Sequence, residues 1–261
     1  MGRILAVANQ KGGVGKTTTA INVASALALA KQRVLVVDLD PQGNLTSGIG
    51  LKGQAAPAGT VYEALTMEPT PDPSGFLLET RVQNLWLMPA DRNLTGAEVE
   101  LVLLPNRERR LRSVLEPLRD KFEFVFIDTP PSLGLLTLNA LVAADAVLIP
   151  LNCEYFALEG LADLVATMRR VRASLNPSLD IEGVLLTMND ERTNLGQQVS
   201  RDVREFFKEK VYKTVIPRNV RLAEAPSHGL PAVTYDARSR GAEAYFAFAK
   251  EVLERNEPAM A

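Results

Sequence analysis

The chain has 261 residues, of which 46% are hydrophobic and 23% are charged, so it can bury a large core and fits one domain spanning residues 1–261. Its net charge is −2, which excludes a bulk polycation, and any binding to nucleic acid must come from a local patch. A single cysteine, Cys153, excludes an internal disulfide, and a single histidine, His228, argues against a zinc site.

The apolar runs of the sequence are too short for a membrane. The first run covers residues 4–8, which is five residues, and leads into a glycine-rich loop, unlike a signal peptide. No run approaches the roughly 20 residues of a spanning helix. The polar, proline-bearing tail at residues 254–261 does not form an amphipathic membrane anchor. We therefore expect a cytoplasmic protein that does not bind membranes.

A glycine-rich loop follows the first predicted strand and precedes a predicted helix over residues 18–31. The loop consists of Lys11, Gly12, Gly13, Val14, Gly15, Lys16, Thr17 and Thr18. Strand, glycine loop and helix form the context of a phosphate-binding loop, because glycines let backbone N–H groups and the helix N-terminus face one anion. We expect Lys16 to reach the outer phosphates of a nucleotide and Thr17 to ligate Mg²⁺. A plain glycine turn is the alternative.

Two more predicted strands end in aspartate. The run 33–38 leads to Asp40, and the run 122–127 leads to Asp128. Carboxylates at the carboxyl ends of strands lie where ligands bind in open α/β sheets. We expect Thr17, Asp40 and Asp128 to form the Mg²⁺ site, with Asp128 holding the ion through water and Asp40 also positioning the hydrolytic water. The alternative role for Asp40 is a helix cap or turn.

Strands and helices alternate along the rest of the chain. Helices are predicted at 61–67, 106–121, 132–144, 155–175, 197–210 and 241–255, and strands at 85–89, 145–150, 181–188 and 214–217. In the helix over 106–121, leucines and a valine lie on one face, and Arg107, Arg109, Arg110 and Arg112 are assigned to the solvated face. The alternation predicts an α/β fold, with a mostly parallel twisted sheet and helices on both faces.

The loop KGGVGKT resembles the deviant Walker A loop of the ParA/MinD ATPases. Further segments resemble the chromosomal ParA (Soj) branch, namely IDTPPSLGLLTLNAL, CEYFALEGL, LLTMNDERTNLGQQV, VIPRNVRLAEAPSHG and YDARSRGAEAY. The resemblance implies a P-loop ATPase that uses ATP and Mg²⁺ and forms an ATP-dependent homodimer, in which Lys11 reaches the partner's nucleotide. It also implies non-specific binding to double-stranded DNA on the nucleoid, and hydrolysis stimulated by a ParB/Spo0J-type protein. Lys11, Lys16 and Asp40 are then the catalytic candidates.

The resemblance also assigns ligand contacts in the C-terminal third. Pro217, Arg218 and Asn219 match the region that contacts adenine, and Met188 is a further candidate. Arg192 and Arg221 match positions that the family uses for DNA, and Arg201, Arg204 and Arg218 complete the DNA candidates. Residues 189–221 contain eight basic and five acidic side chains. From charge alone, an ordinary solvated helix face explains this segment equally well.

Two other functions fit the phosphate-binding loop. A MinD-like ATPase that acts at membranes lacks support because the tail is not amphipathic. A metal-cluster carrier lacks support because no pair of cysteines follows Asp128.

Overall fold

The computed structural model describes residues 2–69, 71–154, 157–189 and 194–256. Within these residues, eight strands form one sheet in the order β3-β4-β2-β5-β1-β6-β7-β8, and the edge strand β3 alone is antiparallel to its neighbour. The strands are β1 (Arg3–Val7), β2 (Val34–Asp38), β3 (Leu78–Glu79), β4 (Leu85–Met88), β5 (Phe124–Asp128), β6 (Ala146–Asn152), β7 (Asp180–Asn189) and β8 (Val211–Pro217).

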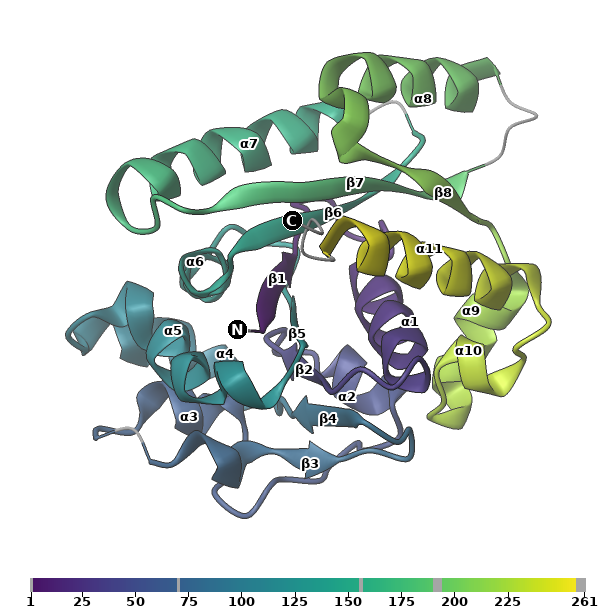
Figure 1. Ribbon diagram of the computed structural model, residues 1–261. Coiled ribbons are helices and arrows are strands. Elements are labelled where there is room, and N and C mark those ends of the chain that lie inside the picture. The colour runs from purple at the N-terminus through teal and green to yellow at the C-terminus, as the bar shows by residue number, and fades with distance from the viewer. Residues whose placement is uncertain (1, 70, 155–156, 190–193, 257–261) are drawn as a thin grey trace, which may run out of the picture.

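Helices cover both faces of this sheet (Figure 1). The helices are α1 (Lys16–Leu29), α2 (Asn44–Gly48), α3 (Val61–Thr66), α4 (Leu94–Glu100), α5 (Arg110–Leu115), α6 (Leu135–Ala143), α7 (Ala157–Ser174), α8 (Asn194–Phe207), α9 (Val220–Glu224), α10 (Ala232–Tyr235) and α11 (Arg240–Asn256). Helices α3 to α8 pack on one face, and α1, α2 and α9 to α11 lie on the other. The predicted α/β fold is confirmed.

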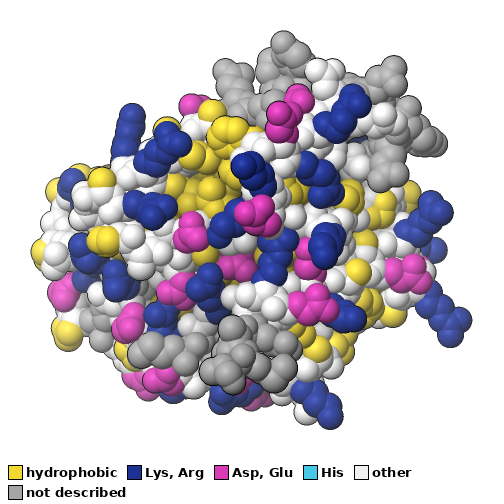
Figure 2. Space-filling model, turned by 45° about the horizontal axis from the view of Figure 1, so that its top comes forward, with side chains coloured by type: hydrophobic (Ala, Val, Ile, Leu, Met, Phe, Trp, Pro, Cys, Tyr) yellow, Lys and Arg dark blue, Asp and Glu magenta, His cyan; other side chains and the backbone are white. Residues whose placement is uncertain are grey.

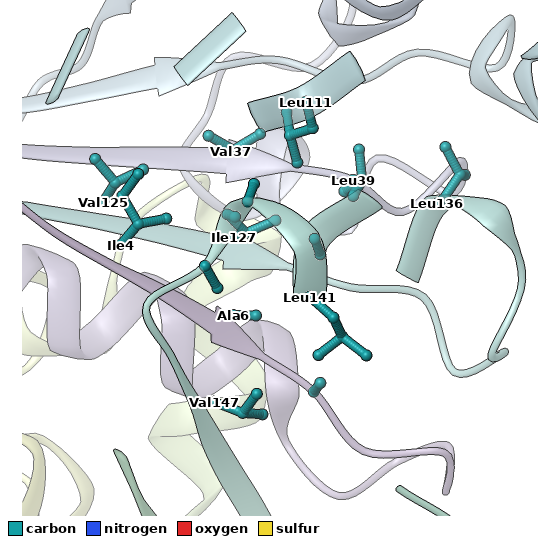
Figure 3. Close-up of a cluster of buried hydrophobic side chains, with 14 of the residues drawn as sticks. Ile4, Ala6, Val37, Leu39, Leu111, Val125, Ile127, Leu136, Leu141 and Val147 are labelled. Atoms are coloured by element: carbon teal, nitrogen blue, oxygen red, sulfur yellow. The ribbon is translucent and has the colours of Figure 1, made fainter. Parts of the chain in front are cut away.

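Alternation along the central strands divides the core into two layers. Ile4 and Ala6 of β1 join the cluster under α5 to α8, whereas Leu5 and Val7 join the cluster under α1 and α11. Figure 3 shows the first layer, where Ile127 of β5 lies among side chains from neighbouring strands and helices. Because both faces are covered, these strands are apolar throughout. Among the described residues, no helix is long and apolar enough to cross a membrane.

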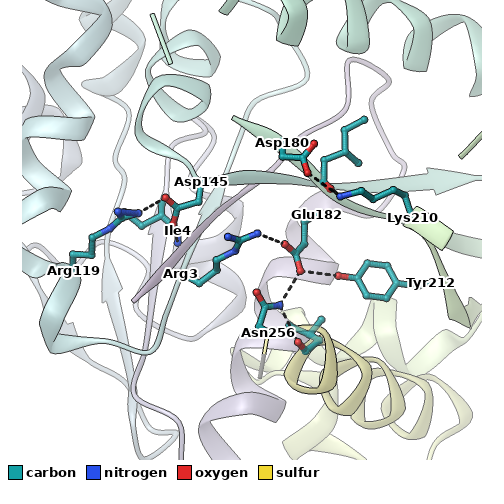
Figure 4. A network of polar contacts seen from close by, with 11 residues as sticks. Arg3, Ile4, Arg119, Asp145, Asp180, Glu182, Lys210, Tyr212 and Asn256 are labelled. Atoms are coloured by element: carbon teal, nitrogen blue, oxygen red, sulfur yellow. Dashed lines mark hydrogen bonds and ion pairs between the residues drawn. The ribbon is translucent and has the colours of Figure 1, made fainter. Parts of the chain in front are cut away.

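A polar network ties the amino-terminal ends of the strands together (Figure 4). The buried carboxylate of Glu182 accepts hydrogen bonds from Arg3 at 2.9 Å and from Asn256 at 2.8 Å. Asp145 accepts the backbone N–H of Ile4 at 2.8 Å and pairs with Arg119. These contacts join β1, β7 and α11 at the edge opposite the carboxyl ends of the strands. The carboxyl ends therefore remain available for the loops of a ligand site.

The structure differs in two respects from the predicted helix over residues 106–121. The structure breaks it into a 3₁₀ turn η3 (Arg107–Arg109), the helix α5 and a second 3₁₀ turn η4 (Glu116–Lys121), which has Pro117 at its start. Arg110 was assigned to the solvated face, yet it is only 7% exposed. Its guanidinium donates to the carbonyl oxygens of Leu65 and Met67, at the end of α3, and pairs with Glu68.

We expect Arg110→Ala to lower the free energy of unfolding by about 2–4 kcal/mol, because it leaves buried carbonyl oxygens without donors. Arg112→Ala, which removes an exposed arginine two positions away, should change it by less than about 0.5 kcal/mol. Urea denaturation of both variants measures the difference. Equal, small losses would show that the guanidinium of Arg110 is dispensable for α3.

Candidate nucleotide site

The glycine loop lies between the end of β1 and the start of α1. Gly13 and Gly15 have φ values of 73° and 86°, in the left-handed region that glycine adopts readily. Gly15 caps α1, so the first turn of the helix opens onto the loop. Thr187, near the end of β7, donates its hydroxyl to the carbonyl oxygen of Val14 at 2.8 Å. The loop is therefore fixed against the sheet with its N–H groups available to an anion.

Lys16 lies at a polar cavity of about 660 Å³. The cavity is lined by Gly12, Gly13, Gly15, Lys16, Thr17, Thr18, Asp40, Pro131 and Met188, together with residues of α2 and of the 3₁₀ turn η6 (Ala225–His228). Lys16 is 7% exposed, and its burial lowers the pKa of the ammonium, while Asp128 and Asp40 oppose that shift. In the part of the chain that the structure describes, its Nζ donates one weak hydrogen bond, to the carbonyl oxygen of Lys11 at 3.4 Å. This ammonium is therefore poised for a stronger anionic partner.

Asp128, at the end of β5, is fully buried. Neither of its carboxylate oxygens has a hydrogen-bond partner of normal geometry within the described residues, although the Thr17 hydroxyl and the Lys16 ammonium lie near enough to favour its charge. Burial, and then the carboxylate of Asp38, raise the pKa of Asp128 well above its ordinary value. An orphaned buried carboxylate beside a threonine hydroxyl fits a Mg²⁺ site, because a hard cation prefers oxygen ligands.

Asp38 and Asp40 have different environments although they are two residues apart. Asp38 is buried, and its Oδ2 accepts the backbone N–H and the hydroxyl of Thr46 at 2.8 and 2.6 Å. Burial raises the pKa of Asp38 to about 6. Asp40 lines the polar cavity, where its Oδ1 accepts the N–H of Gln42 at 2.9 Å and its other oxygen is left for a ligand or water. Asp38 thus anchors α2, and Asp40 faces the site.

A second, mostly apolar cavity of about 370 Å³ adjoins the first. Gly15, Thr18 and Met188 line both cavities, and Met188 has a left-handed φ of 49°, which is uncommon for a side-chain-bearing residue. The remaining lining residues are Thr187, Ile216, Pro217, Arg218, Asn219, Val220, Leu222, Ala223 and Tyr245. The structure thus brings the predicted adenine residues, Met188 and Pro217 to Asn219, to the phosphate loop. A polar cavity joined to an apolar one has the chemistry of a nucleotide site.

Two residues around the loop were missed by the sequence analysis. Asn9 is buried, donates its Nδ2 to the carbonyl oxygen of Pro150 at 2.8 Å and accepts the N–H of Lys11 at 3.0 Å. Glu154 pairs with Lys11 at 2.8 Å and with Arg218 at 3.4 Å. The Asn9–Pro150 and Lys11–Glu154 contacts each join segments more than 140 positions apart, so no local sequence pattern predicts them.

Several known proteins are similar to this chain in sequence, and solved structures are similar to it in fold. A family model described as an AAA domain matches residues 2–181. The chain is 54% identical over 259 residues to the chromosome partitioning protein ParA of Myxococcus xanthus, covering 99% of this chain and 90% of that protein. It is 56% identical over 252 residues to the sporulation initiation inhibitor protein Soj of Bacillus subtilis, covering 97% and 98%. The chain belongs to the ParA/Soj family of partitioning ATPases.

A solved structure shares the fold of this ParA/Soj chain. Cobyrinic acid a,c-diamide synthase from Mycobacterium smegmatis, with bound ADP and magnesium, matches with a TM-score of 0.83 and 40% identity, covering 97% of this chain and 95% of that one. The predicted resemblance and the P-loop ATPase fold are therefore confirmed.

The candidate DNA arginines of this ParA/Soj chain are not gathered on one helix. Arg201 and Arg204 belong to α8, on the same side of the sheet as α7. Arg218 lies between β8 and α9, and Arg221 belongs to α9, which lies beside α11 (Figure 1). Arg221 pairs with Glu224 and Asp236, and Arg204 donates to the carbonyl oxygen of Tyr212 at 3.4 Å. Arg192 lies outside the described residues. Figure 2 shows basic side chains mixed with acidic ones, rather than a uniform basic patch.

We expect Asp128→Asn to raise the free energy of unfolding of the nucleotide-free protein by roughly 1–3 kcal/mol at pH 7, because the amide removes a buried, unpaired charge. Since the folded pKa of Asp128 is raised, the wild type loses stability as the pH climbs above 3.8, its ordinary value, and the two proteins should converge below it. Denaturation in chelator at pH 3 and 7 measures this, with the exposed Asp163→Asn as control. A variant less stable than the wild type at pH 7 contradicts the interpretation.

Proposed function

We propose that this chain, as a single domain, is an ATP-driven DNA-partitioning switch. In the proposal, Mg²⁺–ATP drives formation of a homodimer that binds double-stranded DNA without sequence preference. A ParB/Spo0J-type partner then stimulates hydrolysis of ATP to ADP and phosphate, and the dimer releases the DNA. The switch acts in the cytoplasm on the nucleoid. The names of the ParA and Soj relatives, at more than 50% identity over nearly the whole chain, support partitioning as the process.

The observation that carries the ATPase part is that Lys16 and Asp40 line one polar cavity, which continues into an apolar one, while the buried carboxylate of Asp128 interacts electrostatically with Lys16. Backbone N–H groups of the loop and the Lys16 ammonium would hold the phosphates, and the apolar cavity would take the base. Mg²⁺ held by Thr17 and Asp128 would neutralise phosphate charge. Asp40, at the cavity wall, is placed to orient a water toward the outer phosphate.

Lys11 supports the dimer part of the proposal. It starts the loop, and its side chain is 28% exposed and forms an ion pair with the half-exposed Glu154. An exposed pair of this kind is worth about 0–1 kcal/mol, so the phosphates of a nucleotide on a second copy can compete for the ammonium. The contact of Lys11 with its own Glu154 is therefore compatible with a later contact across a dimer interface.

The DNA-binding step of the proposal rests on arginines at or next to the candidate nucleotide site. Arg218 lines the apolar cavity, and Arg221 follows on α9 with a side chain that is 47% exposed. An acidic chain gains DNA affinity when dimerisation doubles such contacts, because more phosphates are neutralised together. The test is a titration of duplex DNA with ATP, with ADP and without nucleotide, combined with sedimentation of the same samples. DNA binding that is equal in all three states refutes the switch.

We expect Arg221→Ala to weaken DNA binding in the presence of ATP while leaving ATP-dependent dimerisation intact; Arg192→Ala should do the same. The loss should be similar on AT-rich and GC-rich duplexes, because phosphate contacts carry no base information. The slope of log affinity against log salt should flatten by about one unit per lost contact in each protomer. Arg81→Ala, an exposed arginine beside the edge strand, is the matched control. Unchanged affinity and slope move the DNA surface toward Arg201 and Arg204.

A further inference from the structure

The short helix α9 and the turn η6 form a wall of the nucleotide site. Val220, Leu222 and Ala223 of α9 line the apolar cavity, and Pro226 and Ser227 of η6 line the polar one. Asn219 caps α9 by accepting the N–H of Arg221 at 2.9 Å. A ligand in either cavity therefore touches this segment directly. Any shift of this segment on ligand binding also moves those of its residues that line neither cavity.

Arg221 belongs to α9 but lines neither cavity, and two carboxylates of its own chain pair with it. Its Nη1 donates to Oε2 of Glu224 at 2.7 Å, and its Nε lies 3.2 Å from Oδ2 of Asp236, which follows α10. The hydrogen bond to Glu224 raises the pKa of Arg221, and the same bond lowers the pKa of Glu224. One guanidinium between two carboxylates leaves a local excess of negative charge, which repels a DNA phosphate.

Other candidate DNA arginines differ in this respect. Arg218 has one weaker partner, Glu154 at 3.4 Å, and no ion pair within the described ranges involves Arg201. The two partners of Arg221 come from separate elements, α9 and the end of α10, so a displacement of α9 changes its distance to Asp236 without changing its distance to Glu224. The position of α9 therefore decides whether Arg221 keeps its ion pair with Asp236.

We propose that Glu224 and Asp236 form an acidic clamp that competes with DNA phosphates for Arg221, and that nucleotide in the adjoining cavities opens the clamp through α9. The inference rests on the proposed function, since it assigns a regulation to its DNA surface. Glu224 and Asp236 are positioning residues in this scheme, because they act on DNA only through Arg221. A nucleotide opens the clamp only if it binds the open arrangement of α9 more tightly than the closed one.

The test measures DNA affinity of Glu224→Gln and Asp236→Asn at several salt concentrations, with ATP and without nucleotide. The amides keep the shape of the side chains and remove the competing charge. Without nucleotide, we expect each variant to bind DNA about two- to fivefold more tightly than the wild type, as expected when an exposed ion pair is lost. The salt slope should steepen by about one unit, because Arg221 gains a phosphate. With ATP the gain should be smaller, since the clamp is already open.

Two controls separate the clamp from a general loss of negative charge. Glu254→Gln removes the same charge from an exposed ion pair with Lys250 on α11, away from Arg221. In an Arg221→Ala background, Glu224→Gln should no longer tighten DNA binding. Thermal unfolding of each variant checks folding, and Asp236→Asn replaces Glu224→Gln if the latter weakens α9.

The outcomes distinguish the clamp from the proposed function. If the wild type binds DNA with ATP and the clamp variants behave like Glu254→Gln, the clamp is refuted and the proposed function stands. An equal gain with and without nucleotide, or a gain that persists in Arg221→Ala, also refutes the clamp. A wild type that binds no DNA in any nucleotide state refutes the proposed function, and the clamp with it.

Discussion

Lys16→Ala is expected to weaken ATP binding by about 100-fold or more, since it removes a charge-assisted contact to the outer phosphates in a site largely shielded from water. Lys16 is buried at the polar cavity, and within the described residues its Nζ donates one weak hydrogen bond, to the carbonyl oxygen of Lys11. The alanine variant should still fold, because burying the Lys16 ammonium destabilises the wild-type protein through desolvation and the alanine side chain has no such cost. Calorimetric titration with Mg²⁺–ATP measures the affinity.

Lys52→Ala is the matched control for that experiment, because it removes an exposed lysine outside both cavities. It should bind ATP like the wild type. Normal ATP affinity in Lys16→Ala, in a protein with an unchanged unfolding temperature, would refute the assignment of residues 11–18 as the phosphate loop.

Asp40→Ala is expected to bind ATP and to lower the hydrolysis rate by about 100-fold or more, as loss of a residue that positions or deprotonates water does in other hydrolytic sites. Asp40 lines the polar cavity, whereas its neighbour Asp38 is committed to Thr46. Water positioning acts mainly on the transition state, so turnover should fall far more than affinity. Phosphate release and nucleotide binding are measured on the same preparation.

Asp40→Asn tests whether charge or shape matters, because the amide can still accept the N–H of Gln42. If hydrolysis falls in both variants, the carboxylate itself is required. Hydrolysis at the wild-type rate in Asp40→Ala would leave Asp40 with a structural role in the turn that precedes α2.

The elements that the sequence predicts best are the strands that helices cover on both faces of the sheet. Strands β2 and β5 are continuous apolar runs up to their final aspartates because helices cover both faces, and the structure confirms these two strands and β7 within one or two residues. The glycine loop was predictable because its chemistry demands glycine, lysine and threonine at fixed spacing. The adenine candidates, Met188 and Pro217 to Asn219, came from the resemblance, and the structure brings them together.

The remaining features depend on contacts between distant parts of the chain. Arg110 carries the sequence signal of a solvated arginine, but carbonyl oxygens at the end of α3 bind it in the interior. Helix α9 has five residues, too few to show helical periodicity, yet it walls the apolar cavity. Glu154 lies 143 positions from Lys11, so its ion pair has no local signature. The clamp on Arg221 likewise appears only once α10 is packed against α9.

The proposed switch requires that ATP hydrolysis in the nucleotide site ends DNA binding. The most direct measurement follows phosphate release and DNA dissociation together after Mg²⁺–ATP complexes are assembled on duplex DNA, for the wild type and for Asp40→Ala. The account predicts that wild-type DNA release follows phosphate release, and that Asp40→Ala stays on DNA throughout the same period. Dissociation of both proteins at the same rate, without phosphate release from the variant, would contradict the account.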